Sequence, residues 1–169
     1  MARCLIVGCG CRGLSLARRL GADGHAVRGT TRRQAHVPEI EAAGAEPFLG
    51  DPDRVATLAP ALAQVGVACL LLGSASGPRD QLAALHGTRL DMLLERMLDT
   101  TVRGIVYEAA GSVDPELLRE GAQRVARACE RSLIPYVVLG ADPSDHQAWL
   151  DAALAGVQHA LLIRDQFAR

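Results

Sequence analysis

The stretch RCLIVGCGCRGLSLARRLGADGHAVRGTTRR, residues 3–33, decides the fold of this 169-residue chain. Its apolar start predicts a strand over residues 3–7, and Gly8, Gly10 and Gly13 follow in the spacing GxGxxG. The spacing alone is a weak signal. Because it lies directly after a strand and opens a helix within a strand–helix–strand unit, it predicts a dinucleotide-binding turn.

Each glycine of this turn has its own expected structural role. Gly8 permits a tight turn, Gly10 leaves no side chain between the backbone and a pyrophosphate, and Gly13 lets the helix pack close to the sheet. The helix N-terminus adds unpaired N–H groups and a dipole that favours an anion, and the Arg12 side chain can also reach a phosphate. The expected phosphate-binding residues are Gly8, Cys9, Gly10, Cys11, Arg12 and Gly13.

Two other interpretations of the same turn remain open. One is a glycine turn that binds no ligand. The other is a metal site built from Cys4, Cys9 and Cys11, but Cys9 and Cys11 are too close in sequence for a usual zinc pair, and no second cluster completes four ligands. We therefore predict no metal.

The residues after the second expected strand, 25–29, bear on the choice of cofactor. NAD-binding proteins usually place Asp or Glu there to bind the ribose 2′-hydroxyl, whereas this chain has Thr30, Thr31, Arg32 and Arg33. Two hydroxyls and two guanidinium groups suit a 2′-phosphate, which arginine binds in bidentate fashion. The sequence favours NADP(H) over NAD(H), and the alternative is a solvated basic loop.

Two further positions fit a nucleotide site. Asp51 follows the third expected strand, 45–50, and is predicted either to meet the adenine edge or to cap a helix. Gly73, Ser74 and Ala75 follow the fourth, 67–73, at the sheet edge where ligands bind in such folds. Small residues there let a ribose or nicotinamide approach; the alternative is an ordinary flexible loop.

Apolar strand-like runs alternate with helical stretches along the whole chain. Further strands are expected over residues 102–108 and 135–140, a helix over 51–66 and one long helix over 79–99. This alternation predicts an α/β fold, a single doubly wound Rossmann domain over residues 1–169 with a six-stranded parallel sheet and helices on both faces. No stretch remains for a separate substrate domain.

Composition excludes several classes of partner. The formal net charge of −1 gives no electrostatic case for nucleic acid or an acidic membrane surface, and no apolar run approaches the roughly 20 residues that span a bilayer. No secretory signal is visible, so we expect a cytoplasmic location. All 18 basic residues are arginine. Lysine chemistry, including a lysine-assisted tyrosine acid, is therefore excluded within this chain.

These residues resemble the extended and atypical short-chain dehydrogenase/reductase superfamily, also called the NAD-dependent epimerase/dehydratase group. The segment GHAVRGTTRR resembles its NADP-type second strand, and Gly50-Asp51 its adenine-binding pair. GTRLDMLLERMLDTTVRGIVYEAAGSV, residues 87–113, resembles its fourth helix and fifth strand. The resemblance implies a Rossmann fold, a nicotinamide dinucleotide and oxidoreductase activity.

The chain departs from that family at the catalytic positions. The family uses a serine or threonine after the fifth strand and then the motif YxxxK, in which lysine lowers the tyrosine pKa. The serine position falls here on Ala109 or Ala110, and neither Tyr107 nor Tyr136 is followed by lysine. The usual proton relay is therefore not expected.

No other catalytic set stands out. Tyr107, Glu108 and Ser112 lie where the nicotinamide is expected, with Glu108 as a candidate base and Ser112 as a donor. The favoured alternative is that Tyr107 packs, while Glu108 and Ser112 face water or cap the next helix. We expect His86 at the surface and His146, beside the only tryptophan, far from the cofactor.

Three functions are compatible with this pattern. The first is an atypical NADP-dependent reductase or dehydrogenase, with substrate bound over the nicotinamide. The second is a non-catalytic nucleotide- or redox-sensing module that regulates a partner. A weaker third is a regulatory nucleotide domain of the potassium-transport type. The expected ligand is a small-molecule dinucleotide, and either a homodimer through the fourth and fifth helices or a separate protein partner is compatible with the sequence.

Overall fold

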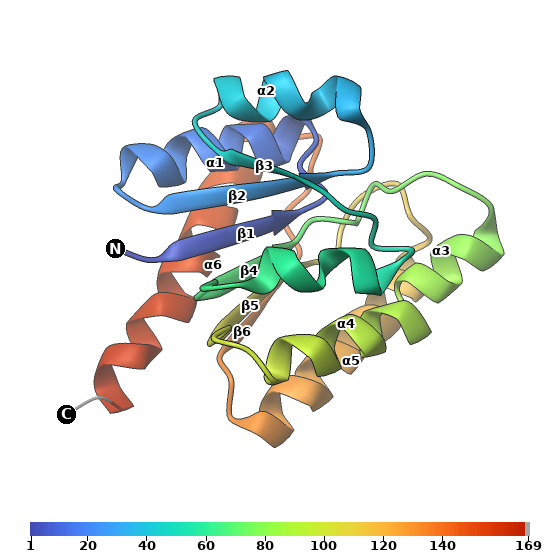
Figure 1. Cartoon of the computed structure of the whole chain (residues 1–169). Coiled ribbons are helices and arrows are strands. Elements are labelled where there is room, and N and C mark those ends of the chain that lie inside the picture. The colour runs from blue at the N-terminus through green and yellow to red at the C-terminus, as the bar shows by residue number, and fades with distance from the viewer. Residues whose placement is uncertain (168–169) are drawn as a thin grey trace.

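Six strands form one parallel sheet in the order β3-β2-β1-β4-β5-β6 (Figure 1). The computed structural model describes residues 1–167, and the side chains of residues 1–162. The predicted six-stranded parallel sheet is confirmed, and its strand order is that of a doubly wound fold. The strands are β1 (Arg3–Val7), β2 (Ala26–Thr31), β3 (Glu46–Leu49), β4 (Val67–Leu70), β5 (Gly104–Glu108) and β6 (Tyr136–Leu139).

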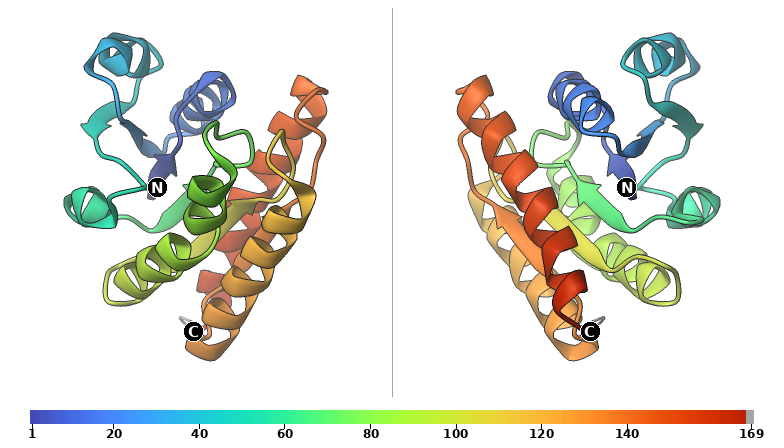
Figure 2. Two further views of the ribbon diagram at one scale, coloured as in Figure 1. Left: turned by 90° about the vertical axis from the view of Figure 1, so that its right-hand side faces the viewer. Right: turned by 90° about the vertical axis from the view of Figure 1, so that its left-hand side faces the viewer.

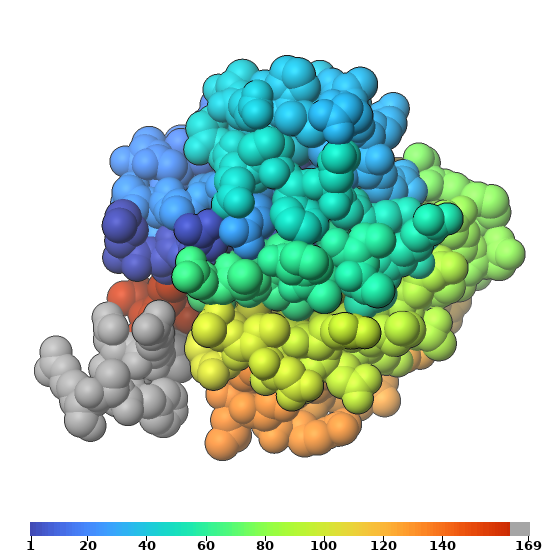
Figure 3. All heavy atoms as spheres, in the orientation of Figure 1, coloured from blue at the N-terminus to red at the C-terminus, as the bar shows by residue number. Residues whose placement is uncertain are grey.

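Helices cover both faces of the sheet, as predicted (Figure 2). On one face lie α1, α2 and α6; on the other lie η2, α3, α4 and α5. In the space-filling view of Figure 3, η2 and α4 cover the face turned to the viewer. The helices are α1 (Cys11–Ala22), α2 (Val37–Ala42), α3 (Arg79–Leu85), α4 (Thr88–Leu98), α5 (Pro115–Ser132) and α6 (His146–Phe167), with 3-10 segments η1 (Gln34–His36) and η2 (Val55–Leu62).

The central strand β1 shows why the sheet needs two helix layers. Its side chains alternate, with Cys4 and Ile6 in the core under α1 and α6, and Leu5 and Val7 in the core under η2 and α4. All four are fully buried. A parallel strand that is apolar on both faces is stable only when both faces are covered, so this sequence specifies a three-layer structure.

The segment after β3 differs from its prediction. Residues 51–66 were expected to form an α-helix, but the structure has a turn followed by the 3-10 helix η2. Pro60 lies inside η2. Proline has no N–H to donate, and its ring clashes with the carbonyl four residues earlier, so it disfavours an α-helix here.

The long helix expected over residues 79–99 is also wrong, because the structure breaks it into α3 and α4. The break lies at His86 and Gly87. A Cβ atom on Gly87 would lie 2.5 Å from the carbonyl oxygen of Ala83, so the backbone there is too close to itself for a larger residue. The break turns His86 into the core, where it is 2% exposed.

The leucine-rich face of α4 belongs to the core of this chain. Leu90, Leu93, Leu94 and Met97 are all at most 3% exposed. These side chains therefore pack within the chain. Among the residues that the structure describes, no helix combines the length and hydropathy needed to cross a bilayer.

Candidate functional site

The glycine turn after β1 has a backbone that only small residues permit. Gly8 has a φ of +85°, in the left-handed region, and a Cβ atom there would lie 2.5 Å from the carbonyl oxygen of Leu71. Its amide donates to Thr30 Oγ1 at 3.3 Å. A Cβ atom on Gly13 would lie 3.2 Å from both the Gly8 carbonyl oxygen and Ile6 Cγ2. The turn is therefore tight, and α1 lies close against the sheet.

The N-terminus of α1 is open toward the crevice. Gly10 is its N-cap, no side chain caps the helix, and its first turn contains no acidic residue. The amides of Cys11, Arg12 and Gly13 have no partner within the helix because an α-helix begins with unpaired donors. A Cβ atom on Gly10 would meet no atom within 4 Å. Free space thus lies in front of a cluster of N–H donors and the positive end of a helix dipole.

A cavity of about 440 Å³ extends from this turn along the carboxyl ends of the strands. Its other walls come from the end of β2, from the entry to η2, from the loop after β4 and from α3. The cavity brings together most of the predicted cofactor-binding residues: Gly8, Cys9, Gly10, Cys11, Arg12, Gly13, Thr30, Thr31, Arg32, Arg33, Ser74 and Ala75.

Two predicted residues, Asp51 and Gly73, do not line the cavity. The Asp51 carboxylate accepts the Asp53 amide at 2.9 Å and so stabilises the turn before η2, but it caps no helix, because the N-cap of η2 is Arg54 and no side chain caps it. Gly73 contacts the loop after β5: a Cβ atom there would lie 2.2 Å from the carbonyl oxygen of Ala110. Both residues therefore make contacts within the loops beside the cavity and do not line it.

Asp53 is the carboxylate that lines the cavity. It accepts hydrogen bonds from Arg89 Nη1 at 2.6 Å and Gln81 Nε2 at 2.7 Å, and Arg32 Nη1 lies 3.7 Å away. An acid therefore lies beside the basic loop, although it comes from the chain after β3 rather than from the end of β2. In the sequence, the only sign of this role is that Asp53 lies in the segment GDPDR, residues 50–54. Asp51 of the same segment is the more obvious candidate for a cavity carboxylate, because it follows the strand directly.

The last two residues of β2 and the two that follow it differ in how free their side chains are to bind a ligand. Thr30 uses its hydroxyl to accept the Gly8 amide, and Thr31 uses its hydroxyl to accept the Arg33 amide at 3.2 Å. The hydroxyls therefore hold the loop in place. The Arg32 side chain is 52% exposed, and Arg33 is also exposed. The two guanidinium groups are thus the accessible polar groups of this loop.

Glu108 departs most from expectation, because it is fully buried rather than facing water. Its carboxylate accepts hydrogen bonds from the Gly73 amide at 2.9 Å, Trp149 Nε1 at 3.0 Å and Arg12 Nη2 at 3.1 Å. A carboxylate can be buried only when charge and donors compensate it, and here α1, α6 and the loop after β4 supply them.

Arg12 joins this buried group to the cavity. Its Nη2 also donates to Ser74 Oγ at 3.0 Å, and its guanidinium carbon lies 5.4 Å from the centre of the Trp149 ring. Trp149 is fully buried, and the sequence analysis gave it no role. Arg12, Glu108, Trp149 and Ser74 together form a cluster that we call the Arg12 cluster.

A second buried polar chain lies behind the cavity. Tyr107 packs, as predicted, and is fully buried, but His86 is in the core rather than at the surface. His86 Nδ1 lies 2.7 Å from Tyr107 Oη, and its Nε2 lies 3.1 Å from the carbonyl oxygen of Leu72. Burial lowers the pKa of His86 and raises the pKa of Tyr107, so both side chains are held neutral at pH 7.

The remaining candidates lie apart from the cavity. Ser112 and His146 are exposed and do not line the cavity, and α5 is capped by Asp114, which accepts the Glu116 amide at 2.9 Å, rather than by Ser112. Cys9, by contrast, does line the cavity, but it is buried, which raises the pKa of its thiol to about 12. No group of three or more His, Cys, Asp or Glu side chains gathers as a metal site in the part of the chain that the structure describes.

Solved structures of short-chain dehydrogenases and epimerases share this fold. A short-chain dehydrogenase/reductase superfamily protein from Agrobacterium tumefaciens, solved with bound NAD, has a TM-score of 0.67 and 18% identity, over 80% of this chain and 48% of that one. A short-chain dehydrogenase from Streptomyces avermitilis has a TM-score of 0.66 and 17% identity, over 81% and 63%. UDP-glucose 4-epimerase from Thermotoga maritima, solved with UDP-glucose, has a TM-score of 0.68 and 12% identity, over 80% and 54%.

The chain therefore has the Rossmann fold found in structures of the short-chain dehydrogenase/reductase superfamily. It spans about half the length of several of the structures it matches. No protein-family model and no curated protein matches it. The similarity to these structures establishes the fold of the chain.

The buried His86 makes stability depend on pH. Because burial lowers its pKa below the ordinary value of 6.5, the unfolded chain binds this proton more tightly than the folded one. The free energy of unfolding therefore falls as the pH drops below 6.5, with a limiting slope of about 1.4 kcal/mol per pH unit, and this contribution is constant at higher pH.

Urea unfolding between pH 7.5 and 5.5 measures this dependence. The variant His86→Gln should show a shallower loss of stability than the parent chain. The matched control, His146→Gln, changes an exposed histidine and should keep the parent's slope. Parallel curves for His86→Gln and the parent chain would show that the titration of His86 does not govern acid stability.

Proposed function

We propose that the chain binds NADP(H), with the diphosphate at the N-terminus of α1 and the 2′-phosphate at Arg32 and Arg33. The observation that carries the proposal is the uncapped start of α1, which faces free space in front of Gly10. Backbone donors and the helix dipole both favour an anion there. The NAD in the Agrobacterium tumefaciens structure supports a dinucleotide as the ligand of this fold.

The choice of NADP(H) over NAD(H) rests on the charges around the end of β2. Arg32 and Arg33 line the cavity and are exposed, so a phosphate can reach both. Asp53 already has Arg89 and Gln81 as partners, and its distance of 3.7 Å from Arg32 leaves that guanidinium loosely held. Arg28 is not available, because it is buried and bonded to Glu46.

The geometry of the site favours a regulatory nucleotide-binding module over an atypical reductase as the function of this chain. The Tyr107 hydroxyl is buried against His86, the Glu108 carboxylate is bonded to three donors, and the chain contains no lysine. None of these groups is placed to exchange a proton with a substrate in the cavity. The similarity to dehydrogenase structures keeps the reductase as the second candidate.

Three broader predictions belong to the same proposal. The assignment of residues 1–169 to one nucleotide-binding domain stays a prediction, and residues 168 and 169 lie outside the described residues. A regulatory role requires a partner, either a second copy of this chain or another protein. We place the protein in the cytoplasm, where its free thiols would stay reduced.

Replacing Gly10 with glutamate tests the phosphate site. A carboxylate at this position would fill the space in front of α1 and repel the diphosphate, so Gly10→Glu should weaken NADPH binding at least about 100-fold, which corresponds to some 3 kcal/mol. Isothermal titration calorimetry measures the change. Gly21→Glu is the matched control, because it adds the same charge at an exposed position of the same helix where a Cβ meets no atom within 4 Å. Equal affinity in the two variants would refute the site.

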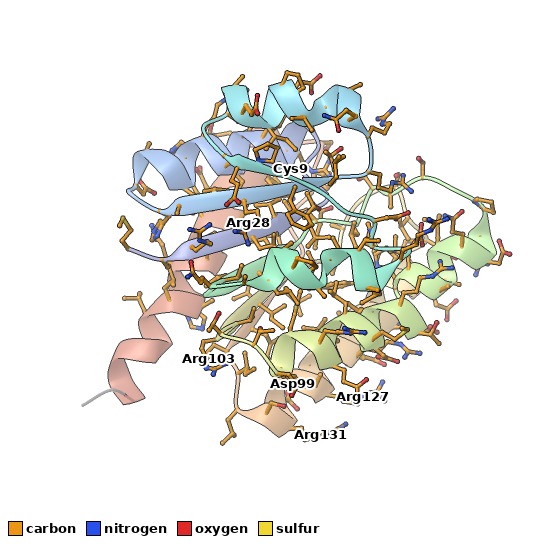
Figure 4. The ribbon with its side chains drawn as sticks, viewed as in Figure 1. Cys9, Arg28, Asp99, Arg103, Arg127 and Arg131 are labelled. Carbon is orange, nitrogen blue, oxygen red and sulfur yellow. The ribbon has the colours of Figure 1, made fainter. Side chains whose placement is uncertain are left out.

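Removing Arg32 and Arg33 together tests the choice of cofactor. Because only NADPH carries the 2′-phosphate, the double alanine variant should weaken NADPH binding about 10- to 100-fold and NADH binding by less than about threefold. The control, Arg127→Ala with Arg131→Ala, removes the same charge from exposed positions on α5, away from Cys9 in the glycine turn (Figure 4). The cofactor assignment is wrong if NADPH and NADH lose affinity equally.

A further inference from the structure

The cavity covers only one half of the crevice that a doubly wound sheet offers. It lies at the carboxyl ends of β1, β2 and β4, and among the described residues none after Leu85 lines it. The carboxyl ends of β5 and β6 therefore contribute nothing to its wall. A dinucleotide bound across such a sheet places its two halves on opposite sides of the point where the strand order reverses. This cavity provides space on the adenosine side.

The Arg12 cluster closes the other side. The Arg12 side chain extends from the start of α1 to Glu108 at the end of β5, with the Trp149 ring beside its guanidinium group. Glu108 and Trp149 are both fully buried. The Ser74 hydroxyl completes the closure from the loop after β4. A row of bonded side chains thus separates the cavity from the ends of β5 and β6.

The loops after β4 and β5 close the same side with their backbones. The Val113 amide donates to the Gly73 carbonyl oxygen at 3.0 Å, and a Cβ atom on Gly111 would lie 2.1 Å from that oxygen. A Cβ atom on Gly73 would in turn lie 2.7 Å from Glu108 Oε1. These two loops are therefore packed too tightly to admit a ring between them. The two contacts with the Gly73 carbonyl oxygen do not involve the side chains of the Arg12 cluster.

The closure is expected to persist when a nucleotide binds. Moving Arg12 away would leave the Glu108 carboxylate in the interior without its charged partner, and an unpaired buried charge is strongly disfavoured. Arg12 can nevertheless meet a diphosphate without leaving Glu108, because a guanidinium group has five N–H donors and the side chain is 25% exposed. The same arginine can bound the phosphate site and seal the space beyond it.

We propose that this site binds the 2′-phosphorylated adenosine diphosphate part of NADP(H) and leaves the nicotinamide ring outside. The inference rests on the proposed function and deepens it, because it defines the ligand as any nucleotide that carries this part. NADP⁺, NADPH and the same molecule without its ring then bind alike. A regulatory module of this kind responds to the amount of nucleotide and not to its redox state.

Calorimetry on the full chain with three ligands tests this proposal. The ligands are NADPH, NADP⁺ and 2′-phospho-ADP-ribose, which is NADP without the nicotinamide ring. The expected dissociation constants lie within about fivefold of one another. Gly10→Glu should abolish binding of all three, which places them at the same cavity.

The outcomes separate the two proposals. If NADPH binds more than about fivefold more tightly than 2′-phospho-ADP-ribose, the ring contributes to binding and the inference fails, while NADP(H) binding stands. If NADP⁺ and NADPH differ by more than this factor, the inference fails in the same way. If none of the three binds, or if Gly10→Glu binds them unchanged, the proposed site fails and the inference with it.

Discussion

The position of β1 between β2 and β4 determines where the crevice opens and where the glycine turn lies. Because successive strands run outward from β1 in both directions, the connections leave β1 and β4 on opposite faces of the sheet, and a crevice opens between them. The turn after β1 has to be narrow enough to enter that crevice, which Gly8 and Gly13 allow. The start of α1 consequently presents its unpaired amides to the cavity, and the N-terminus of the chain lies at the opposite end of β1 (Figure 1).

Arginine supplies every fixed positive side-chain charge around this crevice, and carboxylates from distant segments balance it. Arg12 meets Glu108 in the interior, whereas Arg32 lies near Asp53 at the surface of the cavity. The first pair is buried and bonded on several sides, so it acts as a fixed wall. The second is loose and exposed, so a phosphate can compete for the arginine. This contrast explains why one half of the crevice is closed and the other is open to an anion.

The sequence predicted the features that depend on neighbours along the chain. The six strands, the glycine turn and the absence of a carboxylate after β2 follow from local pattern alone. The break at Gly87 was missed because it goes with the burial of His86, whose partner Tyr107 lies on another element, β5. Glu108 was misplaced for the same reason, since its partners Arg12 and Trp149 lie 96 and 41 residues away in the chain. Nothing in the local pattern reveals a charge that is compensated at that distance.

The proposed NADP(H) binding depends most on a diphosphate bound at the start of α1. Backbone amide NMR on the ¹⁵N-labelled chain, titrated with NADPH, observes the relevant donors directly. The predicted result is that the amide signals of Cys11, Arg12 and Gly13 shift most strongly, together with those of the loop that carries Arg32 and Arg33. Shifts concentrated on another surface, with the three amides of α1 unmoved at saturation, would contradict it.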